Sequence, residues 1–247
     1  MQRVLCYRAT RTGVEMAPKG DLPRHHHRDG YATIVLSGSF IEASFSGRSE
    51  TAPGDVLLHG RFDCHANTAR STRAQILRLP WTNDALEGHF RVRDPDALAR
   101  LAESDPTAAS LQLAAMLEPA PAAPAHWTES LAEHLSHDDG QSLGSWAEKS
   151  SLSPESLSRG FRRVFGVSPQ LFRLQARTRR AWRAIVSCSA SLTSIAHAHG
   201  FADLAHMSRS VTAFTSLSPM AWRSAAACSR RGAPFTDTLP LQPPEGL

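Results

Sequence analysis

The stretch Ala196–Asp203 (AHAHGFAD), followed by Met207–Arg209 (MSR) and Ser218-Pro219, decides the fold of the last hundred residues. The same pattern occurs in an earlier copy, as Ala147–Ser151 (AEKSS), Leu157–Arg159 (LSR) and Ser168-Pro169. From the Ser-Arg pair onward the two copies keep one constant offset. Each copy is typical of a helix-turn-helix. Two copies joined by one long basic helix predict a bipartite DNA-binding unit.

The residue types suit the geometry of this motif. The first helix packs closely across the second, which requires a small residue at the crossing, and Ala147 and Ala196 occupy that position. Four residues later the chain turns sharply, which favours a residue that tolerates left-handed backbone angles. Gly200 meets this need in the second copy, whereas the first copy has Ser151, a weaker choice.

The second helix of each copy has a clear start and two distinct faces. Ser153 before Pro154 is a strong helix start, and Asp203 is the expected N-cap of the second copy. Helical spacing predicts a buried stripe in each helix. These stripes are Leu157, Phe161 and Phe165 in the first copy and Met207, Val211 and Phe214 in the second.

The stretch from about Trp127 to Cys228 resembles the DNA-binding domain of the AraC/XylS family of bacterial transcription regulators. The string Gly200–Asp203 (GFAD), then His206–Arg209 (HMSR), Ser218-Pro219 and Trp222-Arg223 carries this resemblance. In that family each recognition helix enters one of two successive major-groove segments. The resemblance implies base or phosphate contacts for Glu155, Ser158 and Arg159, and for Ala205, His206 and Arg209.

Further basic residues follow in the first copy and in the helix between the copies. We expect Arg162 and Arg163 to contact phosphates, so the first copy should supply more of the salt-dependent binding. The second copy has Thr212 and Ala213 where many family members have basic residues. The connecting helix carries arginines that either face the phosphates or only solubilise it: Arg173, Arg177, Arg179, Arg180 and Arg183.

Charge is divided unevenly along the chain. Residues 141–231 hold 13 Lys and Arg against 3 Asp and Glu, out of 27 and 23 in the whole chain. The remainder is therefore acidic. A basic C-terminal module beside an acidic N-terminal one is typical of a nucleic-acid binder with a separate module of another kind.

Length and composition indicate a multidomain intracellular protein. The chain has 247 residues and four scattered cysteines, without the paired spacing of a disulfide framework. We find no apolar run of membrane-spanning length and no secretion signal, so we expect a cytoplasmic location. The predicted domains are a β-barrel over 1–80, a helical connector and Pro/Ala linker over 81–126, the DNA-binding domain over 127–228 and a disordered tail over 229–247.

The N-terminal region is expected to be all-β. Short strands are predicted at Thr33–Leu36, Phe40–Phe45, Val56–His59 and Gln75–Leu79, separated by Gly- or Pro-containing turns. Many short strands at this spacing indicate a β-barrel or a jelly roll. The predicted fold class is therefore α+β with two domains, an all-β N-terminal domain and an all-α C-terminal one.

Histidines within these strands resemble the two cupin motifs over roughly residues 20–70. The resemblance includes His25–His27, Gly38, Pro53–Asp55, His59 and His65. Tyr31 stands at or near the position of the cupin carboxylate, so the metal set lacks one ligand, and we predict no metal and no cofactor. The effector-site residues predicted from this resemblance are His25, His27, Tyr31, His59 and His65.

Three interpretations of these histidines stay open. They line an effector pocket, they bind zinc or copper with Cys64 replacing the missing carboxylate, or they form a surface cluster that only aids solubility. The resemblance favours the first interpretation, because cupin-like sensor domains are common at the N-terminus of this regulator family.

Between the domains, Asp94–Leu117 is predicted to form two helices broken at Asp105-Pro106. Their leucines form either a dimer contact or a face that packs on the barrel. These leucines are Leu98, Leu101, Leu111, Leu113 and Leu117.

The sequence therefore predicts a transcription regulator, not an enzyme. Its expected partners are a double-stranded DNA operator, a small-molecule effector, a second copy in a homodimer, and RNA polymerase if it activates transcription. No membrane partner is expected. The alternative is a metal-dependent cupin enzyme of the dioxygenase kind, with the helical half as an accessory domain.

Overall fold

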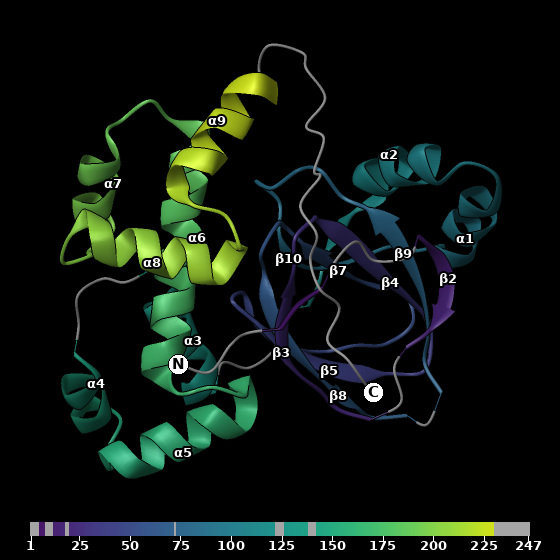
Figure 1. Cartoon of the computed structure of the whole chain (residues 1–247). Coiled ribbons are helices and arrows are strands. Elements are labelled where there is room, and N and C mark those ends of the chain that lie inside the picture. Colours follow the sequence, from purple (N-terminus) through teal and green to yellow (C-terminus); the bar gives the residue numbers. More distant parts are fainter. Residues whose placement is uncertain are drawn as a thin grey trace. The chain divides into compact units, whose positions relative to one another are not determined.

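The computed structural model describes residues 5–7, 12–17, 20–71, 73–121, 126–137 and 142–229 (Figure 1). The chain forms two compact units, residues 1–179 and residues 180–247. Apart from residue 229, the predicted tail lies outside the described residues, as do residues 122–125 of the predicted linker. None of the described helices combines the length and the apolar composition that a membrane-spanning helix requires.

The N-terminal part of the first unit consists of two β-sheets. The five-stranded sheet has the order β1-β3-β8-β5-β6 and the six-stranded sheet has the order β11-β10-β7-β4-β9-β2. The strands are β1 (Leu5–Tyr7), β2 (Gly13–Met16), β3 (Leu22–His27), β4 (Tyr31–Ser37), β5 (Phe40–Ser44), β6 (Gly47–Glu50), β7 (Asp55–His59), β8 (Cys64–Ala69), β9 (Gln75–Pro80), β10 (Gly88–Arg91) and β11 (Glu118–Pro119).

The all-β prediction is confirmed, and the four predicted strands correspond to β4, β5, β7 and β9. The described strands pair as two sheets and form no closed barrel, so the structure agrees with the predicted jelly-roll alternative, a double-sheet arrangement, rather than with a closed β-barrel. The six-stranded sheet also includes β10 and β11, which lie beyond the predicted strand region of residues 1–80.

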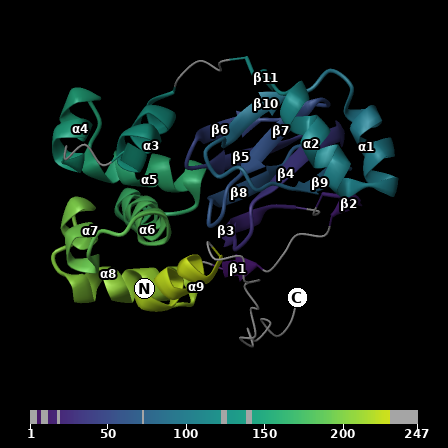
Figure 2. The ribbon, with the colours of Figure 1, turned by 90° about the horizontal axis from the view of Figure 1, so that it is seen from above.

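Two helices, α1 (Pro95–Ser104) and α2 (Pro106–Met116), pack on the six-stranded sheet (Figure 2). Leu98 and Leu113 are fully buried there, and Leu101 and Leu117 pack against the same core. Only Leu111 among the five predicted leucines is exposed, at 72% of its surface. Packing on the sheet is therefore the role of the other four.

The break between these helices follows from their caps. The Asp105 side chain accepts hydrogen bonds from the amides of Thr107 and Ala108, and Pro106 occupies the first position of α2. Both features favour a helix start. The predicted break at Asp105-Pro106 is thereby confirmed.

The C-terminal half is helical, as predicted. The first unit contains α3 (Trp127–His137), α4 (Leu143–Lys149), α5 (Pro154–Phe165) and the start of α6 (Pro169–Ser187). The second unit contains the end of α6, then α7 (Leu192–Ala198), α8 (Leu204–Thr215) and α9 (Pro219–Ser229).

Gly30 lies in the tight connection between β3 and β4, and these strands carry three of the predicted effector residues. A Cβ atom at Gly30 would overlap the carbonyl oxygen of Trp81 and lie 3.0 Å from that of His59. Because both obstacles are backbone atoms, we expect Gly30→Ala to lower the free energy of unfolding by about 1–3 kcal/mol. Urea denaturation monitored by circular dichroism measures this.

The matched control is Gly144→Ala, at an exposed position in α4 where the nearest atom to a new Cβ is 3.8 Å away. Alanine is favoured over glycine in a helix by roughly 0.5–1 kcal/mol, so this variant should be slightly more stable than the wild type. Equal unfolding midpoints for the two variants would contradict the close approach at Gly30.

Candidate functional site

In the first helix-turn-helix, α4 and α5 are joined by a turn at Ser151. Ala147 is buried at the helix crossing, and Ser151 adopts a left-handed φ of +54°. The amide of Leu152 donates to the carbonyl of Ala147, which closes the turn. The Ser153 hydroxyl then caps α5 by accepting from the Ser156 amide at 3.2 Å. The first copy therefore forms the predicted motif.

The second helix-turn-helix, α7 and α8, meets the same demands with different residues. Ala196 is fully buried, Gly200 has a φ of +68°, and the amide of Phe201 donates to the carbonyl of Ala196. Asp203 caps α8 by accepting from the His206 amide at 2.6 Å. The turn at Gly200 and the predicted cap at Asp203 are both confirmed.

The predicted buried stripes of the two recognition helices are also confirmed. In α5 the buried side chains are Leu157, Phe161 and Phe165, and in α8 they include Met207, Val211 and Phe214. The two phenylalanine rings of α5 stack with centroids 4.5 Å apart, and Phe172 of α6 meets both edge to face. This packing fixes which face of each helix remains on the outside.

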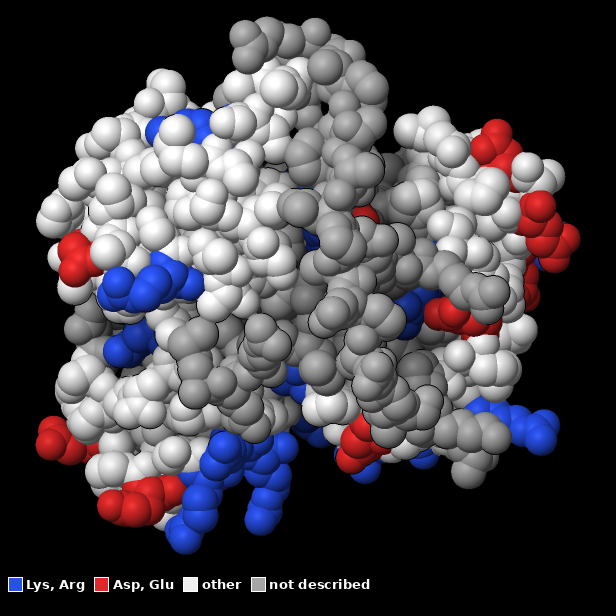
Figure 3. Space-filling model, viewed as in Figure 1, with Lys and Arg blue, Asp and Glu red and all other residues white. Residues whose placement is uncertain are grey.

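The eight predicted DNA-contacting residues lie on that outer face. In α5, Glu155, Arg159, Arg162 and Arg163 are exposed and Ser158 is half-buried. In α8, Ala205 and Arg209 are exposed and His206 is half-buried. Figure 3 shows basic side chains projecting from the surface of the helical region. Their contacts with DNA remain a prediction.

The predicted effector residues lie between the two sheets. In the five-stranded sheet, His25 of β3 is the register partner of His65 on the adjacent strand β8. In the six-stranded sheet, Tyr31 of β4 is the register partner of His59 on the adjacent strand β7. His27, two residues along β3, lies on the same face as His25. We call His25, His27, His59 and His65 the histidine cluster.

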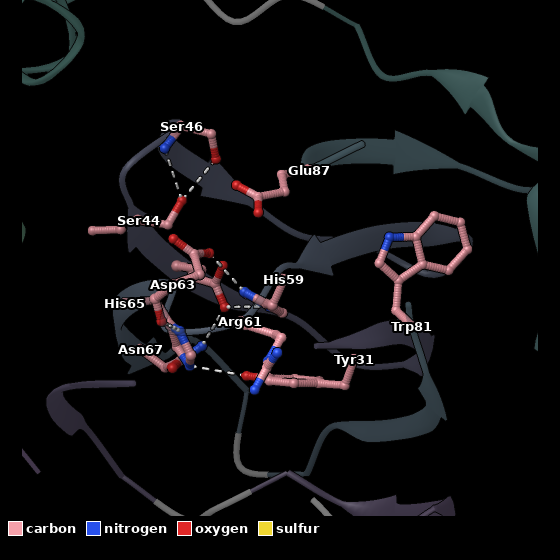
Figure 4. A network of polar contacts seen from close by, with 12 residues as sticks. Tyr31, Ser44, Ser46, His59, Arg61, Asp63, His65, Asn67, Trp81 and Glu87 are labelled. Carbon is pink, nitrogen blue, oxygen red and sulfur yellow. Dashed lines mark hydrogen bonds and ion pairs between the residues drawn. The ribbon is translucent and has the colours of Figure 1, made fainter. Parts of the chain in front are cut away.

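The ring of His65 contacts the rings of the other three histidines of the cluster. The ring centroid of His65 lies 4.3 Å from that of His25, 4.6 Å from that of His59 and 5.4 Å from that of His27. The Tyr31 hydroxyl lies 3.1 Å from His65 Nε2, and Figure 4 shows it pointing at that ring. All five predicted effector residues are thus brought together, and all are buried. Burial excludes the interpretation as a surface cluster.

Two buried carboxylates, Glu42 and Asp63, adjoin the cluster, and neither was predicted from the sequence. His59 Nε2 lies 3.5 Å from Glu42 Oε2. His59 Nδ1 lies 3.1 Å from Asp63 Oδ2 (Figure 4). Glu42 also accepts a hydrogen bond from Asn67 at 3.1 Å. The signal for Glu42 in the sequence is its charge in the middle of the strand Phe40–Ser44, whose other residues are uncharged and which is buried throughout.

Electrostatics divides the cluster into two kinds of histidine. Burial lowers the pKa of His25 to about 4, and it also lowers the pKa values of His27 and His65. Burial opposes charge on His59 too, but Glu42 and Asp63 outweigh it and raise the pKa of His59. Three imidazoles are therefore neutral at pH 7, beside a fourth that is paired with carboxylates.

Cys64 does not replace the missing carboxylate beside the cluster. Its register partner is His26, and its Sγ atom lies 3.7 Å from His26 Nδ1. Side chains alternate along a strand, so Cys64 and His65 point to opposite faces of β8. The carboxylate beside the cluster is instead Glu42, from the neighbouring strand β5.

A small cavity of about 40 Å³ adjoins the cluster, lined in part by His25, Tyr31, Glu42, His65 and Arg78. One water needs roughly 10–15 Å³ on this measure, so the space holds only a few waters. A wider groove of about 950 Å³ lies elsewhere in the same unit, along β6, β10 and α3.

Arg179 of α6 is buried and bonds to residues of the β-region. Its guanidinium forms a bidentate ion pair with the Glu87 carboxylate (2.6 and 2.9 Å), and its Nε donates to the carbonyl of Arg61 at 2.9 Å. It also lies 3.8 Å from Asp63, the residue that contacts His59. Arg179 therefore neither faces phosphates nor solubilises the helix, which corrects both expectations for this arginine.

Arg24, which precedes His25 on β3, makes a second contact between the β-region and α6. Its Nε donates to Gln175 Oε1 at 2.9 Å, and its guanidinium lies over the ring of Phe172, 4.7 Å from the centroid. Gln175 and Phe172 both belong to α6. Two buried arginines thus connect the β-region with α6. Arg24 reaches the helix from β3, and Arg179 reaches the β-region from the helix.

Comparison with known proteins gives one family match. Residues 146–225 match the model of a helix-turn-helix domain. No curated protein is similar enough to be compared with the chain.

Several solved structures are similar at low identity. An AraC-type transcriptional regulator from Chromobacterium violaceum is 22% identical over 41% of this chain and 92% of its own (TM-score 0.38). ToxT from Vibrio cholerae is 10% identical over 87% of this chain and 97% of its own (TM-score 0.41). The C-terminal domain of the response regulator yesN from Fusobacterium nucleatum is 25% identical over 39% and 93% (TM-score 0.34).

Because these TM-scores are low, the interpretation of residues 146–225 depends on the family match and on the geometry of the two helix-turn-helix motifs. Residues 146–225 match a helix-turn-helix domain, which supports the predicted resemblance of this part of the chain to the DNA-binding domain of the AraC/XylS family.

Proposed function

We propose that this protein is a sequence-specific transcription regulator that binds an operator through α5 and α8 and is controlled by a ligand at the histidine cluster. The observation that carries the proposal is the pair of capped helices that bury one apolar face and expose the other. Side chains near the start of each helix would contact base edges, and arginines further along would contact phosphates.

On the DNA side, Arg159 and Arg209 are the best candidates for base contacts. Both are exposed and occupy corresponding positions of the two motifs. An arginine can hold a guanine edge with two hydrogen bonds, which gives sequence discrimination. Arg162 and Arg163 follow in the last turn of α5, where their positive charges also favour the helix C-terminus.

On the ligand side, the contacts with α6 supply a route for control. A ligand changes DNA binding only if it binds one DNA-competence state better than the other. A ligand that changes the position or charge of His59 would act on Asp63, and Asp63 faces Arg179 of α6. Movement of β3 would also act on the contact between Arg24 and Gln175.

We favour a regulator over a metal-dependent enzyme because of the size of the cavity. About 40 Å³ beside the cluster leaves no room for an organic substrate, which typically needs a pocket of roughly 300–1,000 Å³.

The decisive experiment is capture of genomic fragments from the source organism by the purified full chain at near-physiological salt, followed by sequencing. We expect enrichment of a discrete site. Retention of all fragments alike, abolished by moderate salt, would indicate binding to phosphates only and would contradict a sequence-specific regulator.

Arg159→Ala should weaken binding to the enriched site by about 1–3 kcal/mol, while binding to unrelated DNA changes little, if this arginine contacts a base pair. Fluorescence anisotropy with both DNAs measures the two affinities. Arg100→Ala, at an exposed position of α1, is the matched control. An equal loss on both DNAs would reassign Arg159 to a phosphate.

Replacing Arg162 and Arg163 together by alanine should reduce the slope of log affinity against log salt by about 2, since each lost phosphate contact removes roughly 0.9 of slope. The control replaces two arginines of the N-terminal region, Arg93 and Arg100, which are exposed. The same slope in both double variants would mean that Arg162 and Arg163 face away from DNA.

Arg179→Met should lower the free energy of unfolding by about 3 kcal/mol, because it leaves the carboxylates of Glu87 and Asp63 without their buried partner. We take the lower end of the usual range because the Glu87 side chain is 20% exposed. Urea unfolding measures the change, with Arg100→Met as the exposed control. A difference below about 1 kcal/mol would place the Arg179 pair among the weak surface pairs.

A further inference from the structure

We propose that the groove along β6, β10 and α3 binds an amino acid with a cationic side chain, of the lysine or arginine kind. The described residues that line this groove include no member of the histidine cluster, so the two sites are separate. Control of DNA binding by this ligand rests on the function proposed above, whereas the binding itself does not.

The groove has the size of a site for an organic ligand. Its volume of about 950 Å³ lies within the usual range of roughly 300–1,000 Å³. It lies where α3 packs beside β6, the edge strand of the five-stranded sheet (Figure 2). Phe45, Ala120 and Pro121 contribute apolar surface to the lining. The groove therefore suits an aliphatic chain that carries polar groups at its ends.

Acidic side chains outnumber basic ones in the described lining. Besides histidines, the ionisable side chains are four carboxylates and two guanidiniums: Glu50, Asp55, Glu129, Glu133, Arg48 and Arg91. Asp55 and Arg91 form an ion pair at 3.2 Å, which leaves three carboxylates and one guanidinium to face a ligand. A molecule with two cationic groups and one carboxylate complements this set of charges.

Helix α3 supplies the wall that would bind the cationic groups. Glu129 and Glu133 lie one helical turn apart, and both line the groove. Like charges at this spacing destabilise a helix, so a bound cation would relieve their repulsion. Glu129 accepts a hydrogen bond from the Thr128 hydroxyl at 2.8 Å, which orients its carboxylate. Among the described residues, the Glu133 carboxylate forms no ion pair, so its charge is available to a ligand.

The opposite wall supplies the group that would bind the carboxylate of the ligand. Arg48 is exposed on β6 and, within the described part of the chain, forms no ion pair with Glu50 or with the carboxylates of α3. A guanidinium holds a carboxylate through two parallel hydrogen bonds. An amino acid with a cationic side chain would thus span the groove, from Arg48 on one wall to Glu129 and Glu133 on the other.

The groove adjoins the core that supports the first recognition helix. The buried face of α3, with Leu131 and Leu135, packs in one hydrophobic core with Phe161 of α5. On the groove side, the Ser136 hydroxyl of α3 donates to the carbonyl of Phe45 at 3.1 Å. A ligand that bridges β6 and α3 would therefore act on the helix against which α5 packs.

The test is isothermal titration calorimetry of the full chain with L-lysine and L-arginine as probes. We expect one site per chain and a Kd below about 1 mM for at least one of them. Norleucine lacks the side-chain ammonium of lysine and 1,5-diaminopentane lacks its carboxylate, so each should bind about tenfold more weakly than lysine. Absence of saturable binding by both amino acids would overturn the site, and binding of either analogue as tight as that of lysine would overturn the ligand class.

Variants locate the site. Glu133→Gln and Arg48→Gln should each weaken binding of the tighter probe by about 5–10-fold, because each removes one charge-assisted hydrogen bond in a partly open groove. The matched controls are Glu103→Gln and Arg100→Gln, at exposed positions of α1, which should bind as the wild type does. All four side chains are exposed, and circular dichroism verifies that each variant is folded. Equal binding by a groove variant and its control would overturn the assignment.

A separate measurement tests the role of the ligand as an effector. Affinity for the captured DNA site is measured with and without a saturating concentration of the tighter probe, and we expect a difference of about 5–150-fold in either direction. Equal affinities would overturn the effector role. Failure to bind DNA in both states would instead contradict the proposed function, while the calorimetry would still decide whether the groove binds the amino acid.

Discussion

The buried guanidinium of Arg179 is the interaction on which the rest of the first unit depends. Removing such a charge from water is costly unless good geometry and further hydrogen bonds compensate it. Glu87 provides two parallel bonds, Arg61 a carbonyl and Asp63 a second negative charge. Because Asp63 also contacts His59, one carboxylate serves both the anchor of α6 and the histidine cluster. A change of charge on His59 would therefore change the electrostatic energy of the contact between Asp63 and Arg179 of α6.

The two helix-turn-helix copies show that the motif requires certain backbone conformations and packing positions rather than particular residues. The left-handed turn is made by Ser151 in one copy and by Gly200 in the other. At the helix ends the choice is reversed, since Gly166 ends α5 and Ser216 ends α8, both with positive φ. Non-glycine residues rarely adopt this conformation, so each serine is held there by the surrounding bonds. What both copies preserve is a small buried residue at the crossing and a polar cap.

How much the sequence predicted depends on how local each signal is. Helix starts, turns and buried stripes lie within a few residues of one another, so the helical half and its caps, such as Asp203, could be predicted closely. The strands of the β-region were predicted, but the order in which they pair was not, because pairing joins distant residues. Glu42 reaches the cluster only through the pairing of β5 with β8. Arg179 resembled the other arginines of its helix, and only long-range contacts with Glu87 set it apart.

The strand β3 explains how a small ligand could act over a distance. Successive side chains on a strand point to opposite faces, so His25 faces the cluster while Arg24 faces α6. The peptide bond between them is rigid, and a shift of the histidine ring that moves the backbone also moves the guanidinium. Arg24 is held on both sides, by Gln175 and by the rings of Phe45 and Phe172. Two packed arrangements of this contact, rather than a gradual deformation, are what a ligand would have to distinguish, because well-packed interfaces switch between discrete states.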